Sequence, residues 1–269
     1  MMIMEGKSYV IRVSSQKGGV GKTTIATNLA VALAMNSSSR VLLVDADTTS
    51  PSVGFQLGLD DVNIGYEDVI HNRVDLKKAI VIHTPSGVSV LPGTIHVLSH
   101  QPTAENIASF MKKMSGSGYD YVIIDTAPGI SLLGPPEYID EALIITTPDM
   151  TSCTSSMKLA KTLDKHKITH ALLVNRAKNK RFEISKREID ELYGKISYGP
   201  VPEDEDVQES IAQHIPTLIK YGRSPFSKSI QAISYMYLAK KGRAVSEQSK
   251  GLTTGGGLIG FLKRVIGLR

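Results

Sequence analysis

Runs of consecutive apolar residues alternate along the chain with longer stretches whose apolar residues recur at helical spacing. The apolar runs lack polar alternation, which predicts strands that are covered on both faces. The pattern therefore predicts an α/β fold, a three-layer, doubly wound and mostly parallel sheet with helices on both faces. The predicted strands are residues 9–14, 40–45, 121–125, 142–146 and 171–175, and a strand of unassigned direction is expected within 84–93. The predicted helices are residues 22–35, 104–114, 152–166, 185–192 and 225–239.

The alternation of strands and helices stops after Ala239, where the composition changes. Residues 242–257 are rich in Gly, Ser and Thr and end in three consecutive glycines, which is typical of a flexible linker. We expect a domain over residues 1–240, a linker over 241–257 and an amphipathic helix over 258–269.

Residues 258–269 combine apolar and basic side chains in a pattern that predicts a membrane-binding helix. At about 100° per residue the apolar side chains fall within about 180° of arc, and Lys263 and Arg264 lie beyond its edges. Such a helix lies in the plane of an anionic membrane surface. The alternative is a helix that folds back onto the core of the domain. The predicted membrane-contacting residues are Leu258, Ile259, Phe261, Leu262, Lys263, Arg264, Val265 and Ile266.

Composition and charge indicate the class of protein and the cellular compartment in which we expect it. Its 269 residues are 41% hydrophobic and 21% charged, which excludes a wholly disordered chain. The formal net charge is +5, but residues 240–269 hold seven basic residues and one acidic residue, so the rest of the chain carries −1. No window approaches the ~20 apolar residues of a membrane span, and the first residues lack the apolar run of a secretion signal. We expect a cytoplasmic protein that binds reversibly to the inner face of the cell membrane.

A glycine-rich loop joins the first predicted strand to the first predicted helix. Residues 16–24 read Gln-Lys-Gly-Gly-Val-Gly-Lys-Thr-Thr. Glycines let backbone N–H groups surround an anion, and the start of a helix adds its positive end. In such a loop Lys22 neutralises the β- and γ-phosphates of a nucleotide, and Thr23 binds Mg²⁺. The predicted nucleotide-binding residues of this loop are Gly18, Gly19, Val20, Gly21, Lys22, Thr23 and Thr24.

Lys17 distinguishes this loop from the general phosphate-loop pattern. That pattern has glycine at the position of Gln16, which is followed here by a second lysine. The sequence Lys-Gly-Gly-x-Gly-Lys-Thr resembles the deviant phosphate loop of the MinD/ParA ATPases. The resemblance implies a P-loop NTPase fold, the cofactors ATP and Mg²⁺, and a homodimer formed with ATP. It also implies that Lys17 is catalytic, because in that family the extra lysine reaches across the dimer interface to the partner's nucleotide.

Two further predicted strands end in acidic residues and support the same resemblance. Residues 41–47 end in Asp45-Ala46-Asp47, and residues 121–129 contain Asp125 and end in Gly129. Acids at the carboxyl ends of central strands lie beside the phosphate loop, where open α/β sheets bind ligands. By resemblance, Asp45 and Asp125 hold waters of the magnesium shell. Asp47 is implied to position the attacking water, and the backbone N–H of Gly129 to sense the γ-phosphate.

The nucleotide base is predicted to be adenine. Guanine-specific loops of related enzymes use Asn-Lys-x-Asp, in which the aspartate pairs with the guanine edge. Here the last predicted strand ends in Asn-Arg-Ala-Lys over residues 175–178, which has no acid at the fourth place. By resemblance, Asn175 and the loop over residues 201–204, which includes Pro202, flank the base.

The resemblance implies a membrane-associating ATPase that positions partner proteins in cell division or related spatial organisation and is released on hydrolysis. No motif identifies its protein activator or cargo. An iron–sulfur carrier of the Mrp type is disfavoured, because Cys153 is the single cysteine and a bridging cluster needs a pair. Non-specific DNA binding, as in ParA-type segregation ATPases, stays open because residues 158–187 hold ten basic residues against two acidic ones. A nucleotide-gated scaffold without turnover is a third alternative, against which Asp47 argues.

Overall fold

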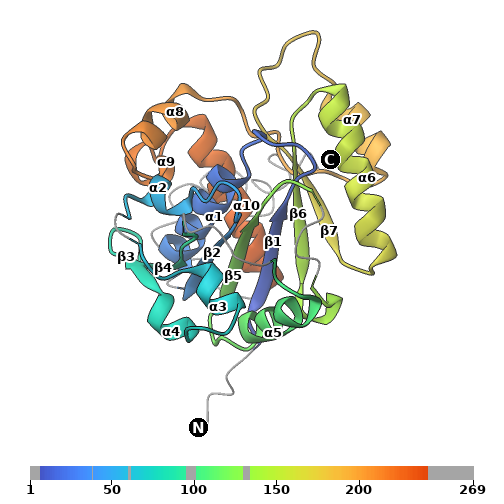
Figure 1. The fold of residues 1–269 in the computed structure, drawn as a ribbon. Helices are drawn as coiled ribbons and strands as arrows, with labels where there is room; N and C mark the ends of the chain where they lie inside the picture. Colours follow the sequence, from blue (N-terminus) through green and yellow to red (C-terminus); the bar gives the residue numbers. More distant parts are fainter. Residues whose placement is uncertain (1–6, 38, 60–61, 95–100, 130–133, 242–269) are drawn as a thin grey trace.

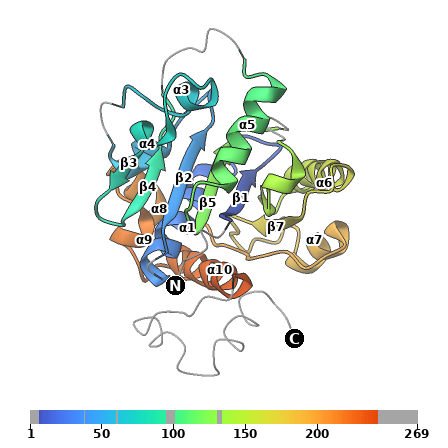
Figure 2. The same ribbon diagram turned by 90° about the horizontal axis from the view of Figure 1, so that it is seen from below.

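The structure is a computed structural model that describes residues 7–37, 39–59, 62–94, 101–129 and 134–241. A seven-stranded sheet in the order β3-β4-β2-β5-β1-β6-β7 forms the middle layer (Figure 1). Helices cover both faces of this sheet (Figure 2). Neighbouring strands run parallel except β3 and β4, which are antiparallel. The predicted three-layer, doubly wound α/β fold is confirmed.

The elements alternate along the chain as the sequence pattern predicts. The strands are β1 (Tyr9–Ser14), β2 (Val41–Ala46), β3 (Val81–His83), β4 (Val88–Leu91), β5 (Tyr121–Thr126), β6 (Glu141–Thr146) and β7 (His170–Val174). The helices are α1 (Lys22–Ser37), α2 (Val53–Leu57), α3 (Tyr66–Ile70), α4 (Leu76–Ala79), α5 (Ala104–Ser115), α6 (Met150–Lys165), α7 (Lys186–Tyr193), α8 (Glu205–Ala212), α9 (Thr217–Lys220) and α10 (Pro225–Lys240), with a 3₁₀ turn, η1 (Pro136–Tyr138).

A side-chain cap accounts for the observed start of α6. Helix α6 starts at Met150 rather than Ser152, because Asp149 Oδ1 accepts a hydrogen bond from the backbone N–H of Ser152 at 2.9 Å. An N-cap carboxylate satisfies a backbone N–H that has no partner within the helix. The helices α2, α3, α4 and α9 were not predicted, because four or five residues give too few turns for a periodic pattern. The eight-residue helix α8 was not predicted either.

The strand of unassigned direction within residues 84–93 is β4, which runs parallel to β2. It is preceded by β3, a strand that the sequence pattern did not reveal. Val81 and Ile82 of β3 are exposed at the edge of the sheet, so their apolar side chains do not follow the pattern of a buried strand. A tight turn at Gly87, whose φ is +72°, joins β3 to β4 and makes the pair antiparallel.

Two hydrophobic layers enclose the sheet. On one face α1 packs against α10, and Ile25 and Leu29 share a core with Ile230 and Ile233. On the other face of the sheet, the apolar residues of α5 and α6 pack against the strand side chains that point toward that face. Since the central strands are parallel, their carboxyl ends meet at one edge of the sheet, and α1 begins at that edge.

The predicted linker and amphipathic helix lie almost wholly outside the described residues. Residues 242–269, which include most of the predicted linker and the whole predicted amphipathic helix, lie outside the described residues. Within the described part of the chain, no helix has the length and apolarity that crossing a membrane requires.

Candidate nucleotide-binding site

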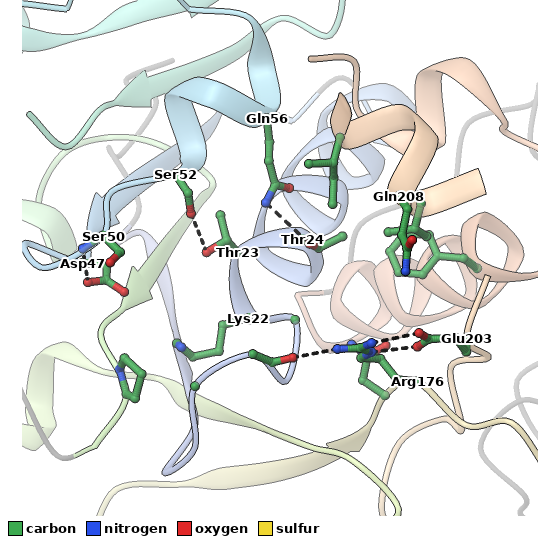
Figure 3. A pocket seen from close by; sticks show the side chains of 18 of the residues that line it. Lys22, Thr23, Thr24, Asp47, Ser50, Ser52, Gln56, Arg176, Glu203 and Gln208 are labelled. Atoms are coloured by element: carbon green, nitrogen blue, oxygen red, sulfur yellow. Dashed lines mark hydrogen bonds and ion pairs between the residues drawn. The ribbon is translucent and has the colours of Figure 1, made fainter. Parts of the chain in front are cut away.

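A cavity of about 750 Å³ opens at the carboxyl edge of the sheet. The segments that follow β1, β2, β5 and β7 line it, and residues 202–204 with α8 close one side. In Figure 3, Asp47 and Ser52 lie on the side of α2, whereas Arg176 and Glu203 lie on the opposite side, with Lys22 between them. In the order of the sheet, β2 and β5 lie on one side of β1, and β6 and β7 lie on the other. The connections that leave the carboxyl ends of these strands therefore run to opposite sides of β1. Ligands of open α/β sheets bind at such a switch point.

The phosphate loop is held by side chains that come from the end of β7. Asn175 Nδ2 donates to the carbonyl oxygen of Val20 at 2.8 Å, and Arg176 Nη1 donates to that of Gly19 at 2.9 Å. The N–H and C=O of a trans peptide point in opposite directions. The N–H groups of Val20 and Gly21 therefore point away from these two side chains, and among the described residues neither donates a hydrogen bond. They are available to an anion at the start of α1.

The residues predicted to hold the metal lie together beside the start of α1. Asp45 and Asp125 are direct partners in the pairing of β2 with β5. The hydroxyl of Thr23 donates to Asp125 Oδ2 at 2.5 Å and accepts from the hydroxyl of Ser52 at 3.2 Å. Asp45 Oδ2 accepts the backbone N–H groups of Ser52 and Val53 at 2.8 and 2.9 Å. These contacts tie the segment between β2 and α2 to the phosphate loop.

Burial of Asp45 and Asp125 makes their ionisation costly. Burial raises the pKa of Asp45 to about 7, despite the backbone N–H groups that bond to its carboxylate. Burial and the neighbouring Asp45 raise the pKa of Asp125 to about 8. Two buried carboxyls side by side favour a proton or a cation between them.

A magnesium ion fits this part of the site. Asp125 Oδ1 is buried and has no hydrogen-bond partner among the described residues, so one acceptor is left for a cation or its water. No cluster of three or more His, Cys, Asp or Glu side chains suited to a metal occurs in the described ranges. Mg²⁺ suits such a sparse set, because it is usually held by one or two carboxylates, water and substrate phosphates. Thr23, Asp45 and Asp125 would hold it, and it would neutralise charge on the phosphates.

Asp47 lies at the wall of the cavity, as a residue that positions water requires. Its side chain is buried, and its Oδ1 accepts the backbone N–H groups of Thr49 and Ser50, both at 3.0 Å. These bonds fix the carboxylate on the segment between β2 and α2. The role of Asp47 in activating water stays a prediction.

Lys17 does not line the cavity of its own chain. Its Nζ lies 2.8 Å from Thr151 Oγ1 and 3.5 Å from Asp149 Oδ1, at the start of α6. Burial opposes the ionisation of Asp149, but hydrogen bonds from Thr147 and Thr151 outweigh it and lower the pKa of this carboxyl to about 2. Lys17 therefore faces an anion outside the nucleotide cavity, and its side chain is about half exposed, at 47%. Its action across a dimer interface stays a prediction.

Gly129 is placed differently from the expectation. Its backbone N–H donates to the carbonyl oxygen of Ser15 at 2.8 Å, and the residue has a φ of +100°. Pro128, rather than Gly129, lines the cavity. In this arrangement the Gly129 N–H is engaged by the chain itself, so sensing a γ-phosphate would require the N–H to leave Ser15.

The base side of the cavity contains a pair that the sequence analysis missed. Arg176 donates through Nε and Nη2 to the two carboxylate oxygens of Glu203 at 2.7 and 2.9 Å. This bidentate bond is the main reason that the pKa of Glu203 is lowered. Arg176 thus connects the phosphate loop to the segment that carries Pro202. The two residues are 27 positions apart, and no local pattern links them.

Asn175 has one acceptor available for the predicted contact with the base. Its backbone N–H bonds to the carbonyl of Thr146 at 2.7 Å, which holds it at the end of β7. Its side-chain Oδ1 is buried without a hydrogen-bond partner among the described residues. An unpaired carbonyl oxygen can accept a hydrogen bond from the exocyclic amino group of adenine, and this contact stays a prediction. Pro202 lies in the cavity wall beside it.

Comparisons with known proteins identify the family. A family model described as an AAA domain matches residues 8–184. The antiactivator FleN of Pseudomonas aeruginosa is 30% identical over 243 residues, which cover 84% of each chain. The septum site-determining protein MinD of Pyrococcus horikoshii, solved with Mg-ADP, is 27% identical with a TM-score of 0.80 and covers 87% of this chain and 98% of that one. The chain belongs to the MinD/ParA family of ATPases. An uncharacterized ATP-binding protein of Methanocaldococcus jannaschii is also similar, at 29% identity over 90% of this chain and 92% of that protein.

Membership of the MinD/ParA family agrees with the geometry of the site. The family consists of P-loop enzymes that hydrolyse ATP, and the phosphate loop of this chain lines the cavity together with Thr23. The predicted family and fold class are both confirmed.

Proposed function

We propose that this MinD/ParA ATPase dimerises around ATP, attaches to an anionic membrane through residues 258–269, and returns to the cytoplasm when ATP is hydrolysed. In the attached state it positions a partner protein. The observation that carries the proposal is the convergence of the phosphate loop, Thr23 and Asp47 on one cavity. Asp125 is bonded to Thr23 behind the wall of that cavity, and a second loop lysine, Lys17, lies outside it.

Hydrolysis needs few groups from the protein. The backbone N–H groups of the loop and Lys22 bind the β- and γ-phosphates and stabilise the charge that develops as the γ-phosphoryl group is transferred. Asp47 orients a water for attack on the γ-phosphorus and accepts its proton. The bond to the β–γ bridging oxygen breaks, and ADP and phosphate leave. Because each of these groups belongs to one chain, ATP binding itself does not require a partner.

The position of Lys17 supports a reaction completed by a second copy. Its Nζ is held at the start of α6, beside the cavity rather than in it. When a partner subunit approaches this face, Lys17 would leave Asp149 and bind the triphosphate held by the partner. Charge stabilisation of a transferring phosphoryl group by one added cation accelerates such reactions by about 10³–10⁵. We therefore expect slow turnover in the monomer.

Membrane attachment follows from the charge pattern of residues 258–269. A short amphipathic segment with two glycines binds weakly by itself. Two copies in one dimer bind more tightly by on the order of 10² or more, because the second segment is already close to the surface. Hydrolysis separates the copies and removes this gain.

The names of the relatives suggest a protein partner. The similar proteins include a septum site-determining protein and an antiactivator. Those names describe different cellular tasks, so the shared element is control of another protein's place or activity. We infer the same class of partner here, an activator or a cargo protein.

The competing DNA-binding function has less support. Three of the ten basic residues between 158 and 187 are engaged with carboxylates of this chain. The pairs are Arg176–Glu203, Lys186–Asp190 and Arg187–Glu191. Engaged cations contribute less to binding of a phosphate backbone.

Lys17→Ala tests the dimer, with Lys158→Ala on an exposed part of α6 as the control. With a non-hydrolysable ATP analogue and Mg²⁺, light scattering after size exclusion should show a dimer for the control and a monomer for Lys17→Ala. ATP should bind both variants, and turnover should fall by 10³-fold or more in Lys17→Ala alone. A dimer of normal stability and unchanged turnover in Lys17→Ala would contradict the proposal.

Deletion of residues 256–269 tests the membrane step separately. Nucleotide binding should persist, whereas sedimentation with anionic vesicles in the presence of ATP and Mg²⁺ should be lost. Equal sedimentation of the shortened and full chains would show that another surface attaches the protein.

A further inference from the structure

A second cavity lies at the opposite edge of the sheet from the nucleotide site. It has a volume of about 840 Å³ and is lined by the amino end of β2, by α4, by residues of the β3–β4 hairpin and by the carboxyl end of α5. We call it the basal cavity. Figure 2 shows the molecule from below, with α4, α5 and α10 around the sheet. A volume of this size lies within the range of small-molecule sites.

Basic side chains dominate the wall of the basal cavity. Among the described residues, Arg40, Lys77, Lys78 and Lys113 line it, against the single acid Asp75. Basic residues therefore exceed acidic ones by four to one there, whereas the whole chain has 31 basic and 26 acidic residues. Like charges gathered in a concave surface with low-dielectric walls concentrate a field that attracts anions.

These four cations are not neutralised by ion pairs. Within the described ranges none of them forms a salt bridge. Lys113 Nζ donates to the neutral amide oxygen of Asn72 at 3.3 Å. A nearby acid, Asp120, accepts the backbone N–H of Arg40 at 2.8 Å and does not line the cavity. The cations are therefore available to a ligand.

The remaining wall narrows the chemistry of that ligand. Leu76, Ile80 and Tyr119 give it an apolar part, and Ser89 adds a hydroxyl. Lysine and arginine donors bind phosphate oxygens strongly. Apolar walls accept the carbon skeleton attached to such a phosphate. The combination suits a phosphate ester with a small organic group better than a bare inorganic ion.

The end of α10 is fastened beside this cavity. Lys241 Nζ donates to the carbonyl oxygen of Asp120, whose backbone N–H donates to the carbonyl of Arg40 at 2.8 Å. Lys240 Nζ bonds to the carboxylate of Glu141 and lies 2.9 Å from the hydroxyl of Tyr198. The last described residue, Lys241, therefore lies next to the wall that contains Arg40.

We propose that the basal cavity is a second anion site, which takes a phosphate ester and, in the membrane-attached state, the phosphate of an anionic lipid headgroup. Its use at the membrane rests on the proposed function, because residues 258–269 would bring this end of the molecule to the lipid surface. The headgroup then adds a contact that orients the domain, with the nucleotide cavity directed away from the membrane.

The test uses the full chain with the variant Lys77→Gln/Lys78→Gln, which we call the basal variant. Both lysines are exposed, so the variant should fold, and unchanged thermal melting checks this. The control Lys158→Gln/Lys161→Gln makes the same change of charge on the exposed side of α6. With ATP, Mg²⁺ and vesicles that contain phosphatidylglycerol, the basal variant should bind at least fivefold more weakly than the control, while its ATPase rate in solution stays unchanged.

A soluble probe distinguishes the source of the phosphate. With the nucleotide site filled by ADP and Mg²⁺, glycerol phosphate should shift amide resonances of residues around the basal cavity, in the control but not in the basal variant. If glycerol phosphate binds in this way and vesicle binding is the same for both variants, the site exists and takes a soluble phosphate ester. If neither probe distinguishes the variants, the basal cavity is no anion site and the proposal is overturned.

Failure of the basal site and failure of the proposed function give different results. If deletion of residues 256–269 leaves vesicle binding unchanged, the membrane role of those residues is wrong, and the response of the basal cavity to glycerol phosphate is unaffected by that result. If the deletion removes vesicle binding and the basal variant behaves as the control in both assays, the proposed function stands and the basal site falls.

Discussion

Two glycines of the phosphate loop allow a sharp test of how the base side supports the phosphate side. Gly19 and Gly21 both have positive φ, at +74° and +94°. A Cβ added to Gly19 would meet nothing within 4 Å, whereas one added to Gly21 would lie 2.4 Å from Asn175 Nδ2. Gly19→Ala therefore changes only the backbone preference, and Gly21→Ala also displaces the amide that bonds to Val20.

The expected costs follow from these contacts. A non-glycine residue in the left-handed region costs about 1–2 kcal/mol, which is the whole effect expected for Gly19→Ala. In Gly21→Ala, the amide of Asn175 loses its 2.8 Å hydrogen bond to the carbonyl of Val20, and a buried polar group without a partner costs about 1–3 kcal/mol more. Gly21→Ala should therefore destabilise the protein by about 2–5 kcal/mol.

The free energy of unfolding of both variants is measured by urea unfolding of the nucleotide-free protein, monitored by fluorescence. Each variant is also combined with Asn175→Ala. Because Asn175→Ala removes the side chain that the new Cβ meets, it should cost less when Gly21→Ala is already present. The coupling energy between positions 21 and 175 should be about 1–3 kcal/mol, and that between 19 and 175 should be close to zero. Equal destabilisation by Gly19→Ala and Gly21→Ala, or additive effects at positions 21 and 175, would refute the reasoning.

Two further predictions concern the buried acids and the pair on the base side. In the folded state the pKa of Asp45 is about 7 and that of Asp125 about 8, above the unfolded value of about 4. Between these values the folded state binds more protons than the unfolded state. Without nucleotide and Mg²⁺, the free energy of unfolding should therefore fall as pH rises from about 4 to 8. Asp125→Asn should reduce that slope in urea unfolding across this range, and an unchanged slope would contradict the assignment. Glu203→Gln should weaken ATP binding about two- to tenfold by titration calorimetry, because the half-exposed Arg176 loses its bidentate partner. Arg176→Lys should bind ATP no more tightly than Glu203→Gln, since an ammonium group cannot replace the two parallel hydrogen bonds of a guanidinium. Wild-type affinity in both variants would refute the role of the pair.

The phosphate loop and the acids were predictable because their signals are local. Lys22 and Thr23 lie in one contiguous motif between a strand and a helix, so the chain places them together without help from distant residues. Asp45 and Asp125 could be placed because each follows a buried apolar run, and the carboxyl ends of parallel strands share one edge. The adenine prediction likewise depended on a short segment at the end of β7.

The contacts that cross between distant segments could not be predicted. Arg176 and Glu203 lie in segments that the sequence assigns to the base side, yet nothing in either segment indicates that these two side chains pair with each other. Lys17 carries a family signature, but its contact with the start of α6 depends on how β6 and the phosphate loop meet. The engagement of the Gly129 N–H by Ser15 could not be foreseen either.

The sequence by itself determined the five central and flanking strands β1, β2, β5, β6 and β7, the longer helices between them, the phosphate loop and the family. Periodic burial and a contiguous motif are encoded by neighbouring residues. The tertiary structure alone decided the direction of β3, the bond between Asn175 and the phosphate loop, the raised pKa values of Asp45 and Asp125, and the gathering of Arg40, Lys77, Lys78 and Lys113 around one cavity. Each of these depends on the distance and burial of groups far apart in the chain, and such distances are set only when the sheet has assembled.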